Sequence, residues 1–158
     1  MTLRIGSGYD VHAFAPNRPL VLGGVTIPYE LGLTGHSDAD ALIHAVVDAL
    51  LGAAALGDIG QHFPSNDSRW KDRPSSVFLS YTLDLLCQQG WSISNIDATI
   101  VAERPKMLPH IPAMRAHLAE HLGLALEQVS VKATTTDGLG FAGRREGIAC
   151  YAVALIER

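Results

Sequence analysis

The sequence predicts an α/β fold, more narrowly an α+β sandwich in which a mixed β-sheet is covered by helices on one face. Strand-like segments with two-residue alternation are interleaved with segments of helical period, in the order three strands, two helices, strand, helix and two strands. The chain has 158 residues, of which 47% are hydrophobic and 18% charged, and such a chain can bury a sizeable core. We therefore expect residues 1–158 to form a single domain.

The first part of the chain is expected to form strands. Residues 3–9 alternate in polarity and include two glycines, which is typical of a short strand. Residues 19–29, PLVLGGVTIPY, hold two apolar and β-branched runs around Gly23 and Gly24. This pattern predicts a β-hairpin that ends near Pro28.

A change to helical spacing predicts the first helix. Apolar residues recur at helical intervals within ALIHAVVDALLGAAALG, so we expect a helix over residues 38–55. Ser37, followed three residues later by Asp40, resembles a capping box with Asp in place of the usual Glu or Gln. The next segment, GDIGQHFPSND, contains turn-forming residues and is expected to be a loop.

The remaining elements follow from the same signals. A second helix is expected within PSSVFLSYTLDLLCQQG, with Ser75 or Ser76 as its cap and Gly90 as its stop, and a third within AMRAHLAEHLG, ending at Gly123. Three prolines exclude a helix interior from RPKMLPHIP. The strands are expected in NIDATIVAE, VSVKATTT and GIACYAVALIE, with a glycine-rich loop, DGLGFAGRREG, before the last one.

Composition excludes several classes of protein. The net charge of −4 argues against a nucleic-acid partner. No apolar run has the length of a membrane span, and MTLRIGSGYD lacks the apolar region of a secretory signal, so we expect a cytoplasmic protein. Neither Cys87 nor Cys150 belongs to a C-x-x-C pair, which argues against a thiolate zinc site or a redox motif.

A possible metal site involves Asp10, His12 and His44. Residues i and i+2 of a strand point to the same side, so the side chains of Asp10 and His12 can converge. His44 lies on a helix that is otherwise almost entirely apolar, and buried polar groups need partners. Two imidazoles and a carboxylate suit Zn²⁺ with an open fourth position, although Mn²⁺, Co²⁺ or Fe²⁺ fits the same ligands. We expect Asp48, one turn further on, to hydrogen-bond the far nitrogen of His44.

Other polar segments could hold phosphate. His36 and Ser37 lie near the expected helix N-terminus, which attracts anions. Lys106 could neutralise a phosphate, but the residues alone favour a rigid surface turn there. In KATTTDG, the hydroxyls could hold phosphate oxygens and Asp137 could bind Mg²⁺ through water, while an ordinary polar hairpin explains the same residues.

Taken in order, these segments resemble the 2-C-methyl-D-erythritol 2,4-cyclodiphosphate synthase family of the non-mevalonate isoprenoid pathway. The matching segments are GYDVHAF, LGGVTIPY, GHSDADALIHAVVDALLGAAALGDIG, FPSND, PKMLPHIPAMR, VKATTT, LGFAGR and EGIACYAVAL. The resemblance implies a homotrimer around a central axis, with active sites between neighbouring subunits. It also implies a lyase that converts 4-diphosphocytidyl-2-C-methyl-D-erythritol 2-phosphate to the 2,4-cyclodiphosphate and CMP.

The resemblance further implies roles for particular residues. Zinc ligands fall on Asp10, His12 and His44, a second cation (Mg²⁺ or Mn²⁺) falls near Asp137, and catalytic roles fall on His36 and Thr135. The implied substrate contacts are Asp10, Val11 and His12; His36 and Ser37 at the phosphates; Asp58, Ile59, Gly60, Phe63, Pro64, Ser65, Asn66 and Asp67 over the methylerythritol part; Ala102, Glu103, Arg104, Pro105, Lys106, Met107, Leu108, Ala133, Thr134 and Thr135 around the cytidine; and Thr136, Asp137, Phe141 and Arg144 near the phosphates and the trimer axis.

The chain departs from the family pattern at three positions. Asp137 and Gly138 replace the usual Glu and Lys, and Arg145 replaces a glycine whose backbone freedom Arg does not share. Two other functions remain open from the sequence. One is a zinc-dependent phosphohydrolase that activates water. The other is a protein that binds a prenyl diphosphate at the trimer axis near Phe141 and Arg144, which could also accompany catalysis as feedback.

Overall fold

The computed structural model describes residues 1–158 and contains the predicted elements together with several short additional ones. The strands are β1 (Leu3–Ala15), β2 (Leu20–Leu22), β3 (Val25–Ile27), β4 (Gly32–Leu33), β5 (Ser92–Val101), β6 (Val129–Thr134) and β7 (Gly147–Glu157). The helices are α1 (Ala41–Ala53), α2 (Ile59–His62), α3 (Ser76–Gln88), α4 (Ile111–Leu122) and α5 (Gly140–Gly143), and 3₁₀ turns cover Ser68–Trp70, Leu108–His110 and Leu126–Gln128. Thus α2 and α5 occupy segments that the sequence predicted as loops.

Five strands form one mixed sheet in the order β4-β1-β7-β5-β6. Strand β7 is antiparallel to both β1 and β5, β4 is antiparallel to β1, and β5 and β6 run parallel. Strands β2 and β3 form the predicted hairpin, in which Leu22 pairs with Val25 across Gly23 and Gly24. Both of these glycines have positive φ angles, as a tight turn requires.

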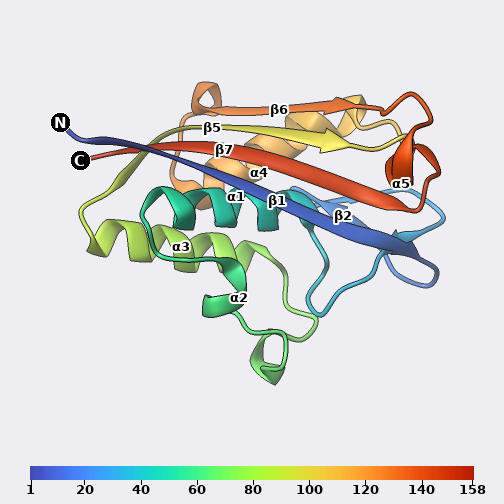
Figure 1. The fold of residues 1–158 in the computed structure, drawn as a ribbon, viewed down its shortest axis with the longest axis horizontal. Coiled ribbons are helices and arrows are strands. Elements are labelled where there is room, and N and C mark those ends of the chain that lie inside the picture. Colours follow the sequence, from blue (N-terminus) through green and yellow to red (C-terminus); the bar gives the residue numbers. More distant parts are fainter.

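Helices α1, α3 and α4 cover one face of the sheet, as predicted, whereas the short helix α5 lies at one end of the sheet beside Tyr9 and Tyr151 (Figure 1). Helix α1 packs on β1 and β7, α3 packs against α1, and α4 contacts β6. The opposite face leaves large apolar side chains exposed, namely Leu3, Ile5, Tyr9, Val11, Tyr151 and Val153. None of the helices combines the length and apolar character needed to cross a lipid bilayer.

Two glycines allow α1 to lie directly on β1. Gly6 and Gly8 share one side of the strand with Asp10 and His12, because side chains alternate along it. A Cβ atom at Gly6 or Gly8 would overlap backbone atoms of α1. This close approach places the first turn of α1 over the part of β1 that carries Asp10 and His12.

Two boundary predictions are wrong. Strand β1 continues to Ala15, beyond the expected range of residues 3–9, so Asp10 and His12 lie well within it. Helix α1 begins at Ala41 and is capped by Asp40 instead of Ser37; the Asp40 side chain accepts a hydrogen bond from the Ile43 amide. The helix cannot extend back to Ser37, because Ala39 has a φ of 59°, in the left-handed region.

Candidate metal centre

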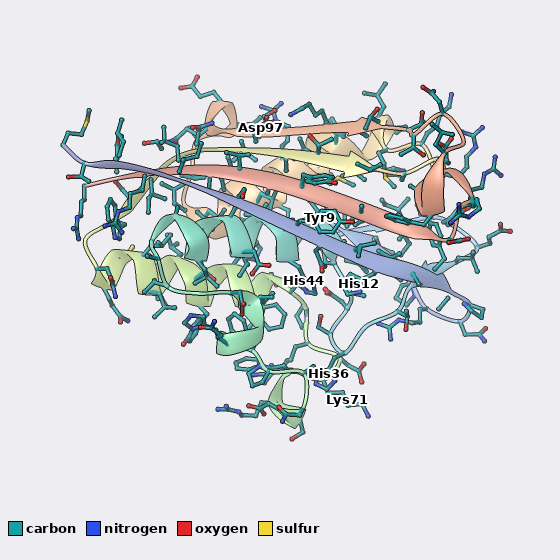
Figure 2. All side chains as sticks on the ribbon, viewed as in Figure 1. Tyr9, His12, His36, His44, Lys71 and Asp97 are labelled. Carbon is teal, nitrogen blue, oxygen red and sulfur yellow. The ribbon has the colours of Figure 1, made fainter.

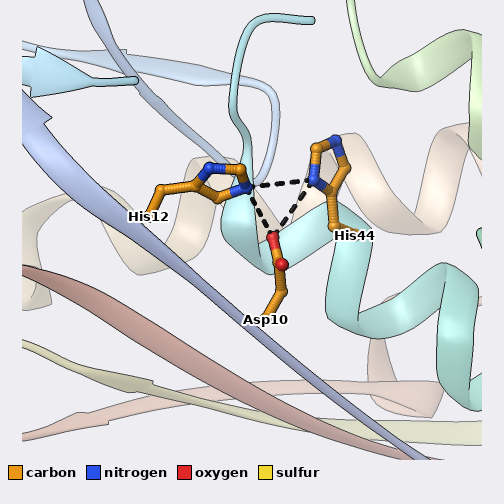
Figure 3. A group of neighbouring side chains, drawn as sticks. All are labelled: Asp10, His12 and His44. Atoms are coloured by element: carbon orange, nitrogen blue, oxygen red, sulfur yellow. Dashed lines mark hydrogen bonds and ion pairs between the residues drawn. The ribbon is translucent and has the colours of Figure 1, made fainter. Parts of the chain in front are cut away.

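Strand β1 and helix α1 bring Asp10, His12 and His44 together, as the sequence predicted (Figure 3). Figure 2 shows His12 and His44 side by side within the whole chain. Asp10 Oδ2 lies 2.7 Å from His12 Nε2 and 3.1 Å from His44 Nδ1, and the two histidine nitrogens are 3.3 Å apart. One ligand atom from each residue lies within 4.8 Å of the other two. Two imidazole nitrogens and a carboxylate oxygen at this spacing fit a divalent cation.

Hydrogen bonds fix both imidazole rings. His12 Nδ1 donates to the backbone oxygen of Thr34 at 2.8 Å, which leaves Nε2 free to bind a metal. His44 Nε2 lies 2.9 Å from Ser75 Oγ and 3.3 Å from Ser37 Oγ. The two rings therefore aim their remaining nitrogens at a common point beside Asp10.

The predicted contact between Asp48 and the far nitrogen of His44 is wrong. The Asp48 carboxylate accepts a hydrogen bond of 2.7 Å from the Ile59 amide and so fixes the start of α2. Helical side chains lean toward the N-terminus of their helix, so the His44 ring points away from Asp48, which follows it by one turn. The far nitrogen of His44 accordingly meets Ser75 at the start of α3.

The three side chains are electrostatically coupled. Burial favours the neutral form of Asp10, but hydrogen bonds and charge interactions with His12 and His44 outweigh it and lower the pKa of Asp10 to about 2. Burial likewise disfavours the charged form of His12. The hydrogen bond and charge interaction with Asp10 outweigh burial, so the pKa of His12 is raised. Asp10 is therefore anionic at neutral pH, and a cation that binds here competes with a proton on His12.

A cavity of about 530 Å³ opens beside the three ligands. Its lining residues are His12, His36, Ser37, His44, Ile59, Gly60, Phe63, Pro64, Ser65, Asn66, Trp70 and Phe78. Of these, Trp70 and Phe78 were not predicted. Their rings pack at 5.1 and 4.3 Å from that of Phe63, so an aromatic cluster forms one wall.

Two predicted carboxylates of the covering loop do not line this cavity. Asp58 caps α2 by accepting from the Gln61 amide at 3.0 Å. Asp67 pairs with Arg69 at 2.6 Å, while its backbone oxygen lies 3.1 Å from His36 Nε2. Both residues hold the loop in shape, which is a common task for Asp in turns.

The predicted cytidine and second-cation residues lie elsewhere in the chain. Thr134, Thr135, Thr136 and Phe141 line a second cavity of about 360 Å³, which shares no lining residue with the first. Lys106 is exposed on the segment after β5. One copy of the chain therefore does not bring these residues to the metal ligands.

Hydrogen bonds and an ion pair hold the segments around this second cavity. Glu103 Oε1 accepts hydrogen bonds from the amides of Thr136 and Gly138, at 3.0 and 3.2 Å, and thereby joins two predicted substrate segments. Asp137, between them, is exposed and has a φ of 52°. Arg144 pairs with Glu146 at 2.8 Å in an exposed ion pair.

Comparison with known proteins identifies the family. A model described as the YgbB family matches residues 3–157. The chain belongs to the YgbB family. A relative from Thioalkalivibrio sulfidiphilus, called 2-C-methyl-D-erythritol 2,4-cyclodiphosphate synthase, is 62% identical over 98% of this chain and 97% of its own length. The resemblance seen in the sequence is thus confirmed.

Solved structures of the family share this fold. The Plasmodium falciparum IspF structure in complex with CDP is 34% identical, with a TM-score of 0.86 over 98% of this chain and 95% of its own. The bifunctional IspDF of Campylobacter jejuni is 42% identical, with a TM-score of 0.94 over 98% of this chain. The chain spans only 42% of the length of that bifunctional protein.

Proposed function

We propose that the chain is a cyclodiphosphate synthase that converts 4-diphosphocytidyl-2-C-methyl-D-erythritol 2-phosphate to 2-C-methyl-D-erythritol 2,4-cyclodiphosphate and CMP. The observation that carries this function is the Asp10, His12 and His44 cluster beside a cavity, in a chain 62% identical to a synthase of that name. Residues 1–158 would act as one domain, and a cytoplasmic location stays a prediction.

The ligand set favours Zn²⁺ as the cation held by Asp10, His12 and His44, because three N and O ligands leave a position open. A cation bound there would polarise a phosphoryl oxygen of the substrate. Asp137 would assist a second cation, Mg²⁺ or Mn²⁺, on the diphosphate.

The chain's own residues would contribute mainly by positioning. The attacking oxygen belongs to the 2-phosphate and is already anionic, so no strong general base is needed. It forms a bond to the β-phosphorus while the bond from that phosphorus to the oxygen bridging the α-phosphate breaks, and CMP leaves with that oxygen. His36 and Ser37, on the cavity wall, would hold phosphate oxygens, and the loop at Phe63 would keep the substrate folded for ring closure.

We further propose that active sites form between subunits of a homotrimer. The uncovered apolar face of the sheet, which includes Tyr9 and Tyr151, offers a surface for other copies. A neighbouring copy would then bring the second cavity, with Thr135 as a catalytic residue and 102–108 as the cytidine pocket, to the metal ligands. A prenyl diphosphate bound near Phe141 and Arg144 stays a prediction.

Subunit mixing tests the shared site. His44→Ala and Thr135→Ala should each be inactive alone. A randomly assembled equimolar mixture of the two should regain about a quarter of wild-type activity, because about three quarters of the trimers are hybrids and each hybrid has one intact site in three. If the site lies within one chain, the hybrids will stay inactive.

The product distinguishes ring closure from hydrolysis. A zinc-dependent phosphohydrolase is not favoured, since the relatives are synthases. Turnover in ¹⁸O-labelled water should yield CMP and an unlabelled cyclic diphosphate, because water does not enter the reaction. A linear phosphate product carrying ¹⁸O would overturn the proposed function, and His44→Ala serves as the inactive control.

A further inference from the structure

The Nε2 side of the His44 ring faces Ser75, a buried serine. Ser75 occupies the N-cap position of α3, where a serine hydroxyl normally accepts a hydrogen bond from the helix. Here the side chain makes no cap bond. Ser75 is fully buried, and its Oγ lies 2.9 Å from His44 Nε2.

Asp38 holds the other side of the same hydroxyl. Its Oδ1 accepts a short hydrogen bond from Ser75 Oγ, and its Oδ2 accepts from the Ser75 amide at 2.9 Å. A carboxylate can only accept, so the hydroxyl proton points toward Asp38. The lone pair of Ser75 Oγ is then available to accept the Nε2 proton of His44.

We propose that Asp38 and Ser75 are positioning residues that orient His44 as a metal ligand. The direction of these two hydrogen bonds fixes the His44 tautomer with its proton on Nε2. The lone pair on Nδ1, which lies 3.1 Å from Asp10 Oδ2, would then be free to bind a cation held beside that oxygen. This inference rests on the metal centre of the proposed function and adds two residues to it, Asp38 just before α1 and Ser75, which lies 31 positions from His44.

If Asp38 and Ser75 only stabilised the fold, substitutions of these two residues would have a different pattern of effects. The bond from the Ser75 amide to Asp38 ties the start of α3 to the loop before α1, and Ser75→Ala keeps it. That substitution removes the hydroxyl alone and leaves Ser37 Oγ, at 3.3 Å, as the nearest remaining acceptor. Asp38→Asn instead offers an amide donor to Ser75, which can reverse the hydroxyl and favour the wrong His44 tautomer.

Metal binding to the full-length protein tests the proposal. The metal-free protein is titrated with Zn²⁺ against a chelator and with Co²⁺ by visible absorption. Loss of a partner that orients a metal-bound histidine typically weakens metal affinity by about 10- to 100-fold, and we expect this for Ser75→Ala and Asp38→Asn. The Co²⁺ bands of both variants should also change, since the His44 ring is no longer fixed.

Ser76→Ala is the matched control, because Ser76 is the next residue and its side chain makes no hydrogen bond. It should bind metal as wild type does. Wild-type affinity and an unchanged Co²⁺ spectrum in Ser75→Ala would overturn the positioning role of Asp38 and Ser75 while leaving the metal centre intact. If Ser75→Ala does not fold, as judged by thermal melting without metal, Asp38→Asn decides by the same two readouts. A wild-type protein that binds neither ion would overturn the metal centre itself.

Discussion

Replacing Gly8 by alanine should disturb the metal centre without touching any ligand. A Cβ atom on Gly8 would lie 2.8 Å from the Ala49 amide nitrogen and 2.9 Å from the Ala45 carbonyl carbon, and closer still to the Ala45 oxygen. These are backbone atoms of α1, so no side chain can rotate away. Relief of the overlap requires α1 to move away from β1 by about 1 Å.

The consequence for His44 follows from its place in the first turn of α1. Metal sites hold their ligand distances to within about 0.2 Å, so a shift of about 1 Å separates His44 from the point shared with Asp10 and His12. We expect at least tenfold weaker Zn²⁺ binding, equivalent to about 1.4 kcal/mol. Overpacking of the helix–strand contact should also lower the free energy of unfolding by about 1–3 kcal/mol.

Two measurements check this prediction: chelator competition for Zn²⁺ affinity and urea unfolding of the metal-free protein for stability. Gly52→Ala is the control, because a Cβ there meets only the Ser7 oxygen at 3.9 Å, an ordinary contact. It should keep metal affinity and gain up to about 1 kcal/mol from helix propensity. Wild-type stability and metal affinity in Gly8→Ala would refute the role assigned to the glycine.

Three further substitutions test separate contacts. The pKa of Asp10 is about 2 against an ordinary 3.8, so its carboxylate stabilises the metal-free fold above about pH 4, and this contribution is lost as the pH falls toward 2. In Asp10→Asn, the melting temperature should therefore fall less over this acidic range than it does in the wild type. An equal fall in both proteins would contradict the ion pairs. Arg145 has a φ of 59°, and Arg145→Gly should raise the free energy of unfolding by about 0.5–1 kcal/mol in urea, while a loss would show that the side chain makes a stabilising contact. Glu103→Ala should weaken CDP binding about tenfold by calorimetry, because two loop amides lose their acceptor, and Glu103→Gln should retain most affinity; equal affinity for Glu103→Ala and wild type would refute the link between the loops.

The ligand triad was predictable because it depends on regular geometry. Alternation in β1 places Asp10 and His12 on one side, and an apolar helix has no reason to bury His44 without partners. The sheet with helices on one face followed from the same periodicities. Family resemblance then related these residues to phosphate chemistry.

Other parts of the site could not be predicted from the chain. Ser75 lies 31 positions from His44, and in sequence it is an ordinary helix cap, so only the packing of α3 against α1 reveals its contact. Helical spacing favoured a hydrogen bond between Asp48 and His44, but the His44 ring points away from Asp48, and the sequence does not show this direction. The separation of Thr135 from the metal ligands is a property of the fold, because β6 and α1 place them in different cavities.

Anomalous scattering at the zinc edge tests the central claim most directly. Crystals of the wild-type protein, grown with Zn²⁺ and soaked with a cytidine nucleotide, should show a peak bonded to Asp10, His12 and His44. The nucleotide should lie against residues 102–108 of a neighbouring copy. A peak away from these ligands, or a nucleotide held entirely by the chain that binds the metal, would contradict the account.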